Sequence, residues 1–561
     1  QKGVNPVCGI SLGALLTVLY GRVRALRQKR RLAVVSGVFS LLLSLSLFAG
    51  AKMDLDAGGF AGFTKLDLLL LPGLFFAVFP CVFLLLEYLS GPASLPALSL
   101  DLSDKKRRRR LALGAAGLIF LCYLLTYLCY FPAISTYDSW VVLAQAADVT
   151  PLNDWHPFLY TLLMRAFTGH SLWSLQTGVA LFAFAQMLFM VLSAGYTVYW
   201  LLQKQAHPAL TALAALYYAL PPVFAAFSMS LWKDVPFGAA ALLYSLCLYD
   251  LMQSKGRILR SPAGILRYAA LTFFTGMLRH NGFYVVAVIS AVLLVYFAVK
   301  QKKESLPLLP VILLAVALVP VANQAAYALG VAKGPSSEAM SLPAQQMART
   351  YVKGGSITGE QLRELGRFFD LEQLKDYDPF LADPAKNSMD KAYFDANKGA
   401  FVKLWLSLMG SNQTAYAEAW LLQTHGYWHP GDKPEAIVSP TANELREMGI
   451  EKHQLLGRGA VVQAWEGLTQ PYDFISIGTL VWVMLFCAAL LLVRRQPDRL
   501  VALLPLLGIW GTMLVAAPLS NSYRYMYALL LAIPFIAFLV LDKDKKAAAG
   551  TPPANQRKQK A

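Results

Sequence analysis

The sequence predicts an all-α polytopic membrane protein with about twelve transmembrane helices, and three observations support this fold class. Hydrophobic residues make up 57% of the 561 residues, more than a soluble core of this size can bury. Many apolar windows reach the roughly 18 residues needed to cross a hydrocarbon layer of about 30 Å, which favours helices over barrel strands. Basic clusters separate these windows in an alternating pattern.

Twelve apolar segments account for the expected spans. The stretch GISLGALLTVLY near the N-terminus is too short to span and is followed by its positive charges, so it fits an interfacial helix or the remnant of a longer segment. Two of the spans are short and flank the sequence RHNG. The expected spans are 32–50, 67–88, 111–130, 172–202, 208–228, 234–252, 267–279, 282–299, 306–330, 474–493, 500–518 and 525–541.

The basic clusters predict the orientation. Alternating the twelve spans puts RVRALRQKRR, KKRRRR, KGRILR, KQKK, RRQPDR and the lysine-rich C-terminus on one side. More than half of the 50 Lys and Arg residues then lie on that side, which the positive-inside rule makes cytoplasmic. The net charge of +17 follows from this topology and from attraction to anionic membrane lipids, so no nucleic-acid partner is expected.

The same pattern divides the chain into five parts. A long segment with short amphipathic patterns and a slight excess of acidic residues separates the spans, and it predicts a mostly helical soluble extracytoplasmic domain. Within it, SITGEQL has the pattern of a helix start. The parts are 1–110 with two extra transmembrane helices and a polybasic loop, 111–330 with an acidic first outer loop at 131–171, the soluble domain at 331–473, 474–541 with the last transmembrane helices, and a polar cytoplasmic tail at 542–561.

The first outer loop is acidic in an otherwise basic chain. Its segment TYDSWVVLAQAADVTPLNDWHP holds three aspartates and one histidine, without Lys or Arg. In a half-buried cavity an aspartate can accept a proton from a sugar hydroxyl or hold a divalent cation. Asp138 and Asp154, the latter beside His156, are therefore the catalytic candidates, and the two carboxylates are also the metal-binding candidates. Asp148 has the pattern of a solvated or capping residue.

Three further outer loops carry polar groups at the membrane boundary, where such groups are costly unless they serve each other or a ligand. They contain the sequences SLWKDVP, RHNG and SNSYRY. Lys233, Arg279 and Arg524 together would clamp a phosphate or diphosphate. A second WHP, in QTHGYWHPGD, adds aromatic groups that suit sugar faces, although the core of the outer domain explains them equally well. The remaining substrate-binding candidates are Asp234, His280, Asn281, Tyr525, Trp428 and His429.

Simpler roles fit several of these residues. Asp138 would cap the helix SWVVLAQAA, because Asp is a favoured N-cap residue. His156 would precede a helix that begins with the following proline. Lys233 and Asp234 would form a local ion pair, and Arg279 would extend to lipid phosphates.

These motifs together resemble those of the GT-C membrane glycosyltransferases, and more narrowly an uncharacterised bacterial branch of that superfamily. The similarity rests on YDSW and NDWHP in an acidic outer loop after an early span, and on KDVPF, RHNG and SYRY at outer helix ends. It covers about 111–330 and 474–541. The resemblance implies a polyprenyl-phosphate-linked sugar donor, a catalytic Asp in the first outer loop and, in many members, a divalent cation such as Mg²⁺ or Mn²⁺.

Carried over to this chain, the resemblance makes Asp138 the catalytic base, supported by Asp154 and His156. The adjacent acidic pair of many family members is absent, because YDS holds one carboxylate, and this departure leaves the use of a metal ion open. The implied reaction is an inverting transfer in which the three cations stabilise the departing polyprenyl phosphate. The implied acceptor is a cell-envelope glycan or lipid, and the implied location is the bacterial cell membrane with the site facing outside.

A transporter or flippase of lipid-linked or anionic solutes is the alternative function. Alternating access usually places charged groups near the mid-membrane and often shows two repeated halves. This chain keeps its charges at helix ends and has a lopsided layout, so its sequence favours the transferase. A non-catalytic scaffold in envelope assembly is a third class, in which the loop carboxylates would be dispensable.

Overall fold

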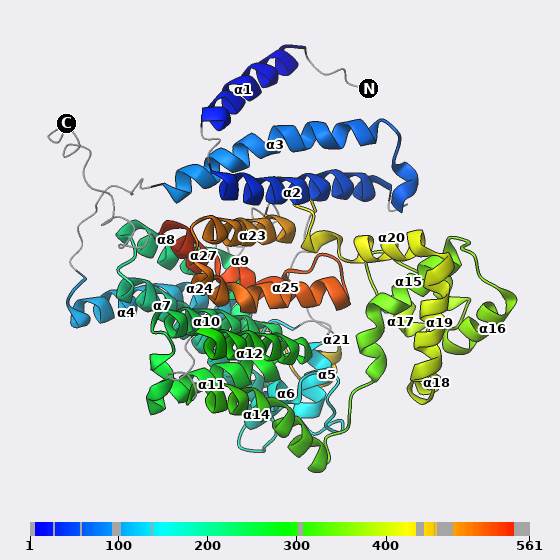
Figure 1. Cartoon of the computed structure of the whole chain (residues 1–561). Helices are drawn as coiled ribbons and strands as arrows, with labels where there is room; N and C mark the ends of the chain where they lie inside the picture. The colour runs from blue at the N-terminus through cyan, green and yellow to red at the C-terminus, as the bar shows by residue number, and fades with distance from the viewer. Residues whose placement is uncertain are drawn as a thin grey trace.

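The computed structural model describes residues 6–25, 29–56, 59–91, 102–135, 138–300, 307–432, 443–453, 455–456 and 475–542. These residues form helices joined by short loops and contain isolated β-bridges but no strand (Figure 1). Among them, eight helices are long and apolar enough to cross a membrane, and two bent helix pairs raise that number to ten. The chain is an all-α, multi-pass membrane protein, as predicted.

Each of the twelve expected spans has a helix in its place, but not every helix is long enough to span by itself. Two short ones are α11 (Pro262–Met277) and α23 (Ile477–Val493), with 16 and 17 residues. The bent pairs are α8 (Pro208–Ala219) with α9 (Pro222–Met229), and Tyr523–Leu531 with α27 (Ile533–Leu541). The full count of twelve therefore stays a prediction.

The remaining long helices each follow one expected apolar window. Their boundaries lie where charged, Gly or Pro residues interrupt that window, as expected for helices with apolar sides facing lipid or one another. They are α2 (Arg30–Asp56), α3 (Asp67–Ser90), α4 (Lys105–Cys129), α7 (Leu175–Gln203), α10 (Asp234–Gln253), α12 (His280–Lys300), α14 (Leu308–Ala328) and α24 (Pro497–Leu500) continuing through η7 (Val501–Leu503) into α25 (Leu504–Ala516).

The N-terminal helices form a layer on one side of the bundle (Figure 1). The stretch 9–20 lies within α1 (Pro6–Ala25), which contacts α3. Helices α2 and α3 pack on each other and on α23, and Phe39, Phe83 and Leu490 lie in the apolar cluster between them. The N-terminal helices therefore pack against the C-terminal end of the chain.

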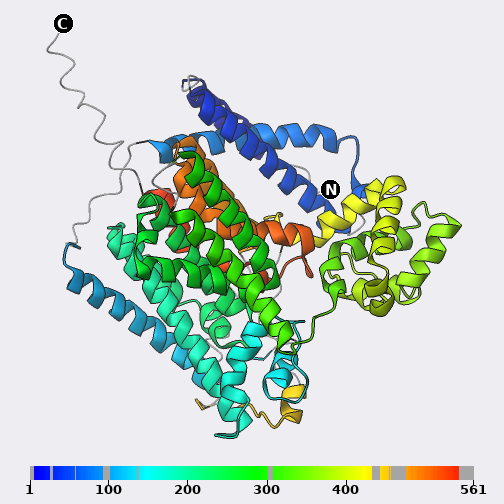
Figure 2. The same cartoon turned by 60° about the horizontal axis from the view of Figure 1, so that its bottom comes forward.

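The expected soluble domain follows α14 and has a hydrophobic core of its own. In both views it lies to one side of the bundle, connected to α14 by an extended segment (Figures 1 and 2). The KKRRRR start of α4 lies at the opposite end of the molecule (Figure 1). The helices of the outer domain are α15 (Ser341–Val352), α16 (Gly359–Phe368), α17 (Asp383–Asn387), α18 (Lys391–Ala396), α19 (Lys398–Ser411) and α20 (Gln413–Gln423). The short α21 (Asn443–Glu447) follows in the sequence but packs on the core of the bundle through Leu445.

The predicted helix start at SITGEQL is confirmed. The Thr358 hydroxyl accepts a hydrogen bond from the Gln361 backbone at 3.2 Å, and the Gln361 side chain accepts one from the Thr358 backbone at 2.9 Å. This reciprocal capping box satisfies two backbone N–H groups that the first turn of α16 leaves without partners.

A buried ion pair joins the outer domain to the N-terminal helices. Arg349 of α15 donates two hydrogen bonds to Glu418 Oε2 of α20, at 2.9 and 2.8 Å. Glu418 Oε1 accepts a third from the backbone N–H of Phe60, at 2.6 Å, in the turn η1 (Gly59–Gly62) between α2 and α3. One carboxylate thus connects two parts of the molecule.

We expect Glu418→Ala to destabilise the protein strongly, because it leaves the Arg349 guanidinium buried without its carboxylate. Removing one partner of a buried pair costs about 3–5 kcal/mol. The measurement is the melting temperature of the detergent-solubilised protein. Glu364→Ala is the control, since it breaks an exposed pair with Arg367 whose loss costs at most about 1 kcal/mol. Equal melting temperatures for the two variants would contradict this role of Glu418.

Candidate active site

Asp138 lies in a cluster of charged side chains from three parts of the chain. It occupies the N-cap position of α5 (Ser139–Ala146), but its side chain makes no capping hydrogen bond. Instead, Asp138 Oδ2 accepts a hydrogen bond from Arg524 Nη1 at 2.7 Å and lies 3.4 Å from Lys233 Nζ. Helix capping therefore does not account for Asp138, whose carboxylate is paired with two cations.

Backbone pairing holds the first outer loop beside the segment that precedes α10. Ile134 accepts a hydrogen bond from Leu231 N at 2.9 Å and donates one to the Met229 carbonyl at 3.2 Å. The Ser139 hydroxyl, next to Asp138, donates to the Leu231 carbonyl at 3.2 Å. These contacts bring Asp138 within reach of Lys233, two residues after Leu231.

The cluster changes the proton affinities of two residues in the first outer loop. Burial raises the pKa of Asp138, but Lys233 and Arg524 together outweigh it and hold that pKa well below its usual range. His156 is buried, and its Nδ1 lies 3.1 Å from Lys233 Nζ. Burial and the Lys233 charge lower the pKa of His156 to about 3. At neutral pH the carboxylate is therefore ionised and the imidazole neutral.

A second buried ion pair lies next to the first. Asp234 Oδ1 is 2.9 Å from Arg279 Nη1, and both side chains are almost fully buried. Asp234 and Lys233 therefore do not form the local pair considered above, and Arg279 does not extend to lipid. The guanidinium carbons of Arg279 and Arg524 lie 5.0 and 4.6 Å from the ring centre of Tyr525, which connects the two ion pairs through cation–π contacts.

Asp154 is buried and uses both carboxylate oxygens. Oδ2 accepts a hydrogen bond from the Tyr327 hydroxyl at 2.6 Å, and Oδ1 accepts one from Phe158 N at 3.3 Å, at the start of α6 (Phe158–Thr168). Asp154, rather than His156, therefore supports the beginning of this helix. Its backbone N–H donates to the Ala332 carbonyl at 2.8 Å, which ties the loop to the entrance of the outer domain.

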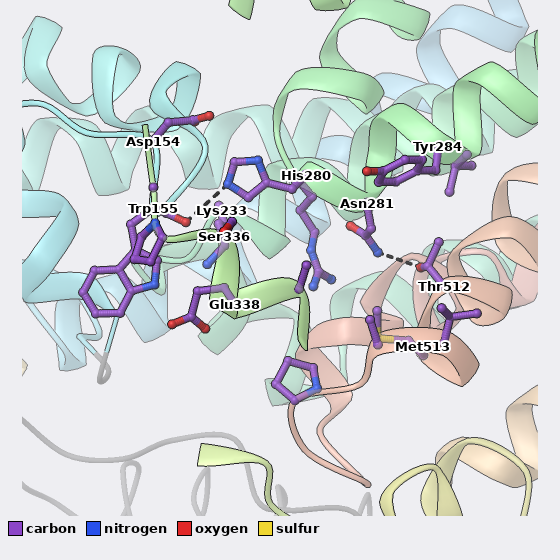
Figure 3. Close-up of a pocket in the computed structure, with 18 of the residues that line it drawn as sticks. Asp154, Trp155, Lys233, His280, Asn281, Tyr284, Ser336, Glu338, Thr512 and Met513 are labelled. Carbon is purple, nitrogen blue, oxygen red and sulfur yellow. Dashed lines mark hydrogen bonds between the residues drawn. The ribbon is translucent and has the colours of Figure 1, made fainter. Parts of the chain in front are cut away.

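A cavity of about 1010 Å³ opens beside these groups. In Figure 3, Trp155 and Glu338 lie on one side of the opening, and Asn281, Thr512 and Met513 lie on the other. The His280 ring reaches the Trp155 carbonyl, with Nε2 at 3.3 Å, and Asn281 Nδ2 donates to the Thr512 hydroxyl at 2.7 Å. The polar lining residues are Asp154, Trp155, Lys233, Arg279, His280, Asn281, Tyr284, Tyr327, Lys333, Ser336, Glu338 and Thr512.

The other end of the cavity is an apolar groove between α12 and α25. It is lined by Tyr284 and Val288 of α12 and by Gly508, Gly511 and Val515 of α25. Tyr284, Val288 and Val515 are 65, 60 and 69% exposed, so in spanning helices they face lipid. Val288 and Gly508 lie about two turns inside their helix ends, roughly 12 Å at 1.5 Å per residue. The cavity thus connects charged groups at the boundary to the membrane interior.

Seven of the predicted site residues do not line this cavity: Asp138, His156, Asp234, Arg524, Tyr525, Trp428 and His429. The first five belong to the charged cluster beside it, whereas Trp428 and His429 have other contacts. The Trp428 carbonyl accepts hydrogen bonds from Ser46 of α2 and from Trp482 of α23, and the His429 ring packs directly on Gly50 of α2. Both residues therefore join the outer domain to the N-terminal helices. Their neighbour Tyr427 is fully buried, and its hydroxyl donates to the Leu519 carbonyl at 2.7 Å.

The two candidate metal ligands are engaged with other groups. Asp138 is paired with two cations, and Asp154 accepts hydrogen bonds from Tyr327 and Phe158 N. Within the described part of the chain, no group of three or more His, Cys, Asp or Glu is placed to hold a metal ion. As placed, this donor set does not fit a divalent cation. Metal binding stays a prediction from the resemblance, and no step below depends on it.

Several residues of the cavity were not predicted from the sequence. Trp155 lies in the motif NDWHP between the candidates Asp154 and His156, and this position could have indicated that it belongs to the site. Tyr327 lies near the outer end of an expected span, where a tyrosine is typical of the membrane interface and so attracts no attention. Ser336 and Glu338 follow that span and reach the cavity only because the extended segment after α14 turns back across it.

The fold and site define an α-helical membrane protein with a buried charged cluster beside a cavity that faces lipid. The chain belongs to a family described as one of unknown function, DUF6020, whose model matches residues 146–554. The matched range includes Asp154, Lys233, Arg279 and Arg524, and it begins eight residues after Asp138. Neither a curated protein nor a solved structure matches the chain.

We expect His156→Gln to reduce the acid sensitivity of the protein. Because the folded pKa of His156 is about 3, the unfolded chain with a pKa near 6.5 binds the extra proton, and stability falls as pH drops between these values. One such group contributes up to about 1.4 kcal/mol per pH unit. Melting temperatures from pH 7.5 to 4.5 test this, with His170→Gln as a control in the same loop. Parallel curves for wild type and His156→Gln would contradict the assignment.

Proposed function

We propose that the protein transfers a sugar from a polyprenyl-phosphate-linked donor to a hydroxyl group of a cell-envelope glycan or lipid. The observation that carries this proposal is the cavity, because it joins cationic side chains to an apolar groove that faces lipid. A lipid phosphate has the same two parts, an anionic head and an apolar chain. A soluble phosphorylated substrate would have no use for the groove.

The donor phosphate would bind at the polar end of the cavity. Lys233 and Arg279 line it and supply an ammonium group and a planar guanidinium group, both suited to phosphate oxygens. His280 and Asn281 lie at the start of α12 on the same wall. The polyprenyl chain would leave along Val288 and Gly508, so the donor could enter sideways from the bilayer.

The reaction then needs one proton acceptor and stabilisation of one leaving group. The acceptor oxygen attacks the anomeric carbon as the bond from that carbon to the phosphate oxygen breaks, and the acceptor proton passes to a carboxylate. The departing polyprenyl phosphate keeps the electron pair of the broken bond, and the Lys233 and Arg279 charges stabilise it. Attack opposite to the leaving group inverts the anomeric configuration.

Asp138 is the proposed proton acceptor. Both of its cation contacts use Oδ2, and Oδ1 takes part in neither. A phosphate that binds Lys233 would withdraw that cation from Asp138, so the pKa of the carboxylate would rise toward values at which it accepts a proton more readily. Asp154 lies in the cavity lining but is hydrogen bonded through both oxygens, which suits a positioning role.

The geometry supports a transporter less well. The described spans carry their charged side chains near the helix ends, with the pair Asp234–Arg279 on one side and Asp250 on the other. At that second side, Lys204 and Arg267 contact Asp250 at 2.6 and 3.1 Å and link α7, α10 and α11.

We place the cavity on the outer face of a bacterial cell membrane. Twelve spans and a GT-C-like arrangement of the helices are parts of the same proposal.

We expect Asp138→Asn to reduce sugar transfer by about 100-fold or more, because it keeps the side-chain shape but removes the base. The melting temperature is measured as the folding control, since Asn also leaves Lys233 and Arg524 without this carboxylate. The assay is transfer from a pool of polyprenyl-phosphate sugars by purified protein, with and without a metal chelator. Asp148→Asn is the control: Asp148 is exposed, pairs with Arg165 and has a φ of 62°, a conformation that Asn tolerates. Turnover like wild type in Asp138→Asn would contradict this role and favour Asp154 or transport.

A further inference from the structure

We propose that the outer end of the cavity is a saccharide site, in which the Trp155 indole packs on a pyranose ring and Glu338 and Ser336 hydrogen bond to its hydroxyl groups. This inference rests on the proposed function, since it assigns the part of the same cavity that is left for the sugar once phosphate and lipid are placed. It also replaces the sugar-binding role that the sequence suggested for Trp428.

The Trp155 side chain is held in place and remains accessible. Its backbone N–H donates to Asn153 Oδ1 at 3.0 Å, and its carbonyl contacts the His280 ring at 3.3 Å. The indole is nearly parallel to the His156 ring, at 6° and 5.6 Å between ring centres, yet the residue is 41% exposed and lines the cavity. The indole is therefore fixed, and the part of it that stays exposed to the cavity can pack on a sugar ring.

Lipid anchoring does not explain this tryptophan. Exposed Trp residues at a membrane boundary usually lie among the head groups. Trp155 instead has the Lys391 ammonium of α18 at 5.9 Å from its ring centre, so its indole lies between the cavity and the outer domain. Figure 3 shows Trp155 on the same side of the opening as Glu338. Glu338, like Lys391, belongs to the outer domain.

The polar partners come from the short helix η3 (Ser336–Met340) at the entrance of the outer domain. Glu338 Oε2 accepts a hydrogen bond from Lys386 at 2.7 Å, and the Ser336 hydroxyl donates to Asp395. Both side chains line the cavity. They are therefore positioned before any ligand binds, which lowers the entropic cost of binding.

A close backbone contact brings these groups to Trp155. The Ala332 N–H donates to the Leu152 carbonyl at 3.0 Å, and the Ala332 carbonyl accepts a hydrogen bond from Asp154 N at 2.8 Å. A Cβ at Gly334 would lie 2.7 Å from the Asp154 carbonyl oxygen and 2.8 Å from Trp155 Cα. Only glycine allows the segment to pass this close, and η3 follows directly after it.

An aromatic ring beside a carboxylate and a hydroxyl group suits a saccharide. A pyranose presents C–H groups on its face, which pack on an aromatic ring, and hydroxyl groups on its edge, which bond to a carboxylate and a hydroxyl. An apolar ligand would displace water from the Glu338 carboxylate and the Ser336 hydroxyl without offering either of them a new hydrogen bond. The pyranose belongs either to the lipid-linked donor or to a glycan acceptor.

Binding measurements on the full chain in lipid nanodiscs test the inference. The probes are methyl glycosides of glucose, galactose, mannose and N-acetylglucosamine, the corresponding polyprenyl-phosphate sugars, and polyprenyl phosphate alone. Trp155→Ala should weaken at least one saccharide probe by about 10-fold or more, Trp155→Phe should retain most of that affinity, and Glu338→Gln should weaken it severalfold. Affinity for polyprenyl phosphate alone should not change. Trp140→Ala is the control, because Trp140 is similarly exposed, at 39%, and is not part of this lining.

The two sources of the sugar give different results. Weaker binding of polyprenyl-phosphate sugars alone assigns the site to the donor, and weaker binding of methyl glycosides assigns it to the acceptor. Saccharide affinity equal to wild type in Trp155→Ala, or no saccharide binding by the wild-type protein, overturns the inference. Transfer by both wild type and Trp155→Ala at equal rates rejects the saccharide site but keeps the transferase. Binding that depends on Trp155 without any transfer keeps the site and rejects the transferase.

Discussion

The carboxylate of Asp138 holds together parts of the chain that are 386 residues apart, through its pairing with Arg524 and Lys233. Cations at the edge of a membrane are costly unless an anion accompanies them, because neither lipid nor a packed bundle solvates them as water does. The second pair, Asp234 with Arg279, meets the same requirement next to it. Together they fix the neighbouring ends of α10, α12 and the last helices beside one cavity.

The cluster holds three cations and two carboxylates, because Lys233 and Arg524 share Asp138, and this pairing bears on how the site could act. A resting cluster in which each cation has a carboxylate is stable without a ligand, yet a phosphate can compete for Lys233 and Arg279 from the cavity side. Binding of the phosphate would draw Lys233 away from Asp138 and raise the pKa of that carboxylate. Donor binding would therefore make Asp138 a better proton acceptor. The neutral His156 ring beside Lys233 lets this happen without adding another positive charge.

Much of the fold was predictable because lipid imposes a strong rule on sequence. Long apolar windows broken by charges placed a helix at every expected span, and the polar loops at one set of helix ends predicted that Asp138, Lys233 and Arg524 would meet. The sequence could not show that Asp234 pairs with Arg279 rather than with Lys233, since that depends on helix rotation. Nor could it show that Trp428 and His429 pack on α2 and α23, because that contact depends on how distant helices lie side by side.

The most direct test of the central claim is whether the groove between α12 and α25 holds the chain of a lipid phosphate. A photo-crosslinking residue at Val288, in the groove, is compared with one at Val295, which is equally lipid-exposed on α12 but outside the cavity lining. We expect polyprenyl phosphate to crosslink at position 288 far more than at 295, and the double substitution Lys233→Gln with Arg279→Gln to abolish the difference. Equal crosslinking at the two positions, unchanged by these substitutions, would contradict this claim.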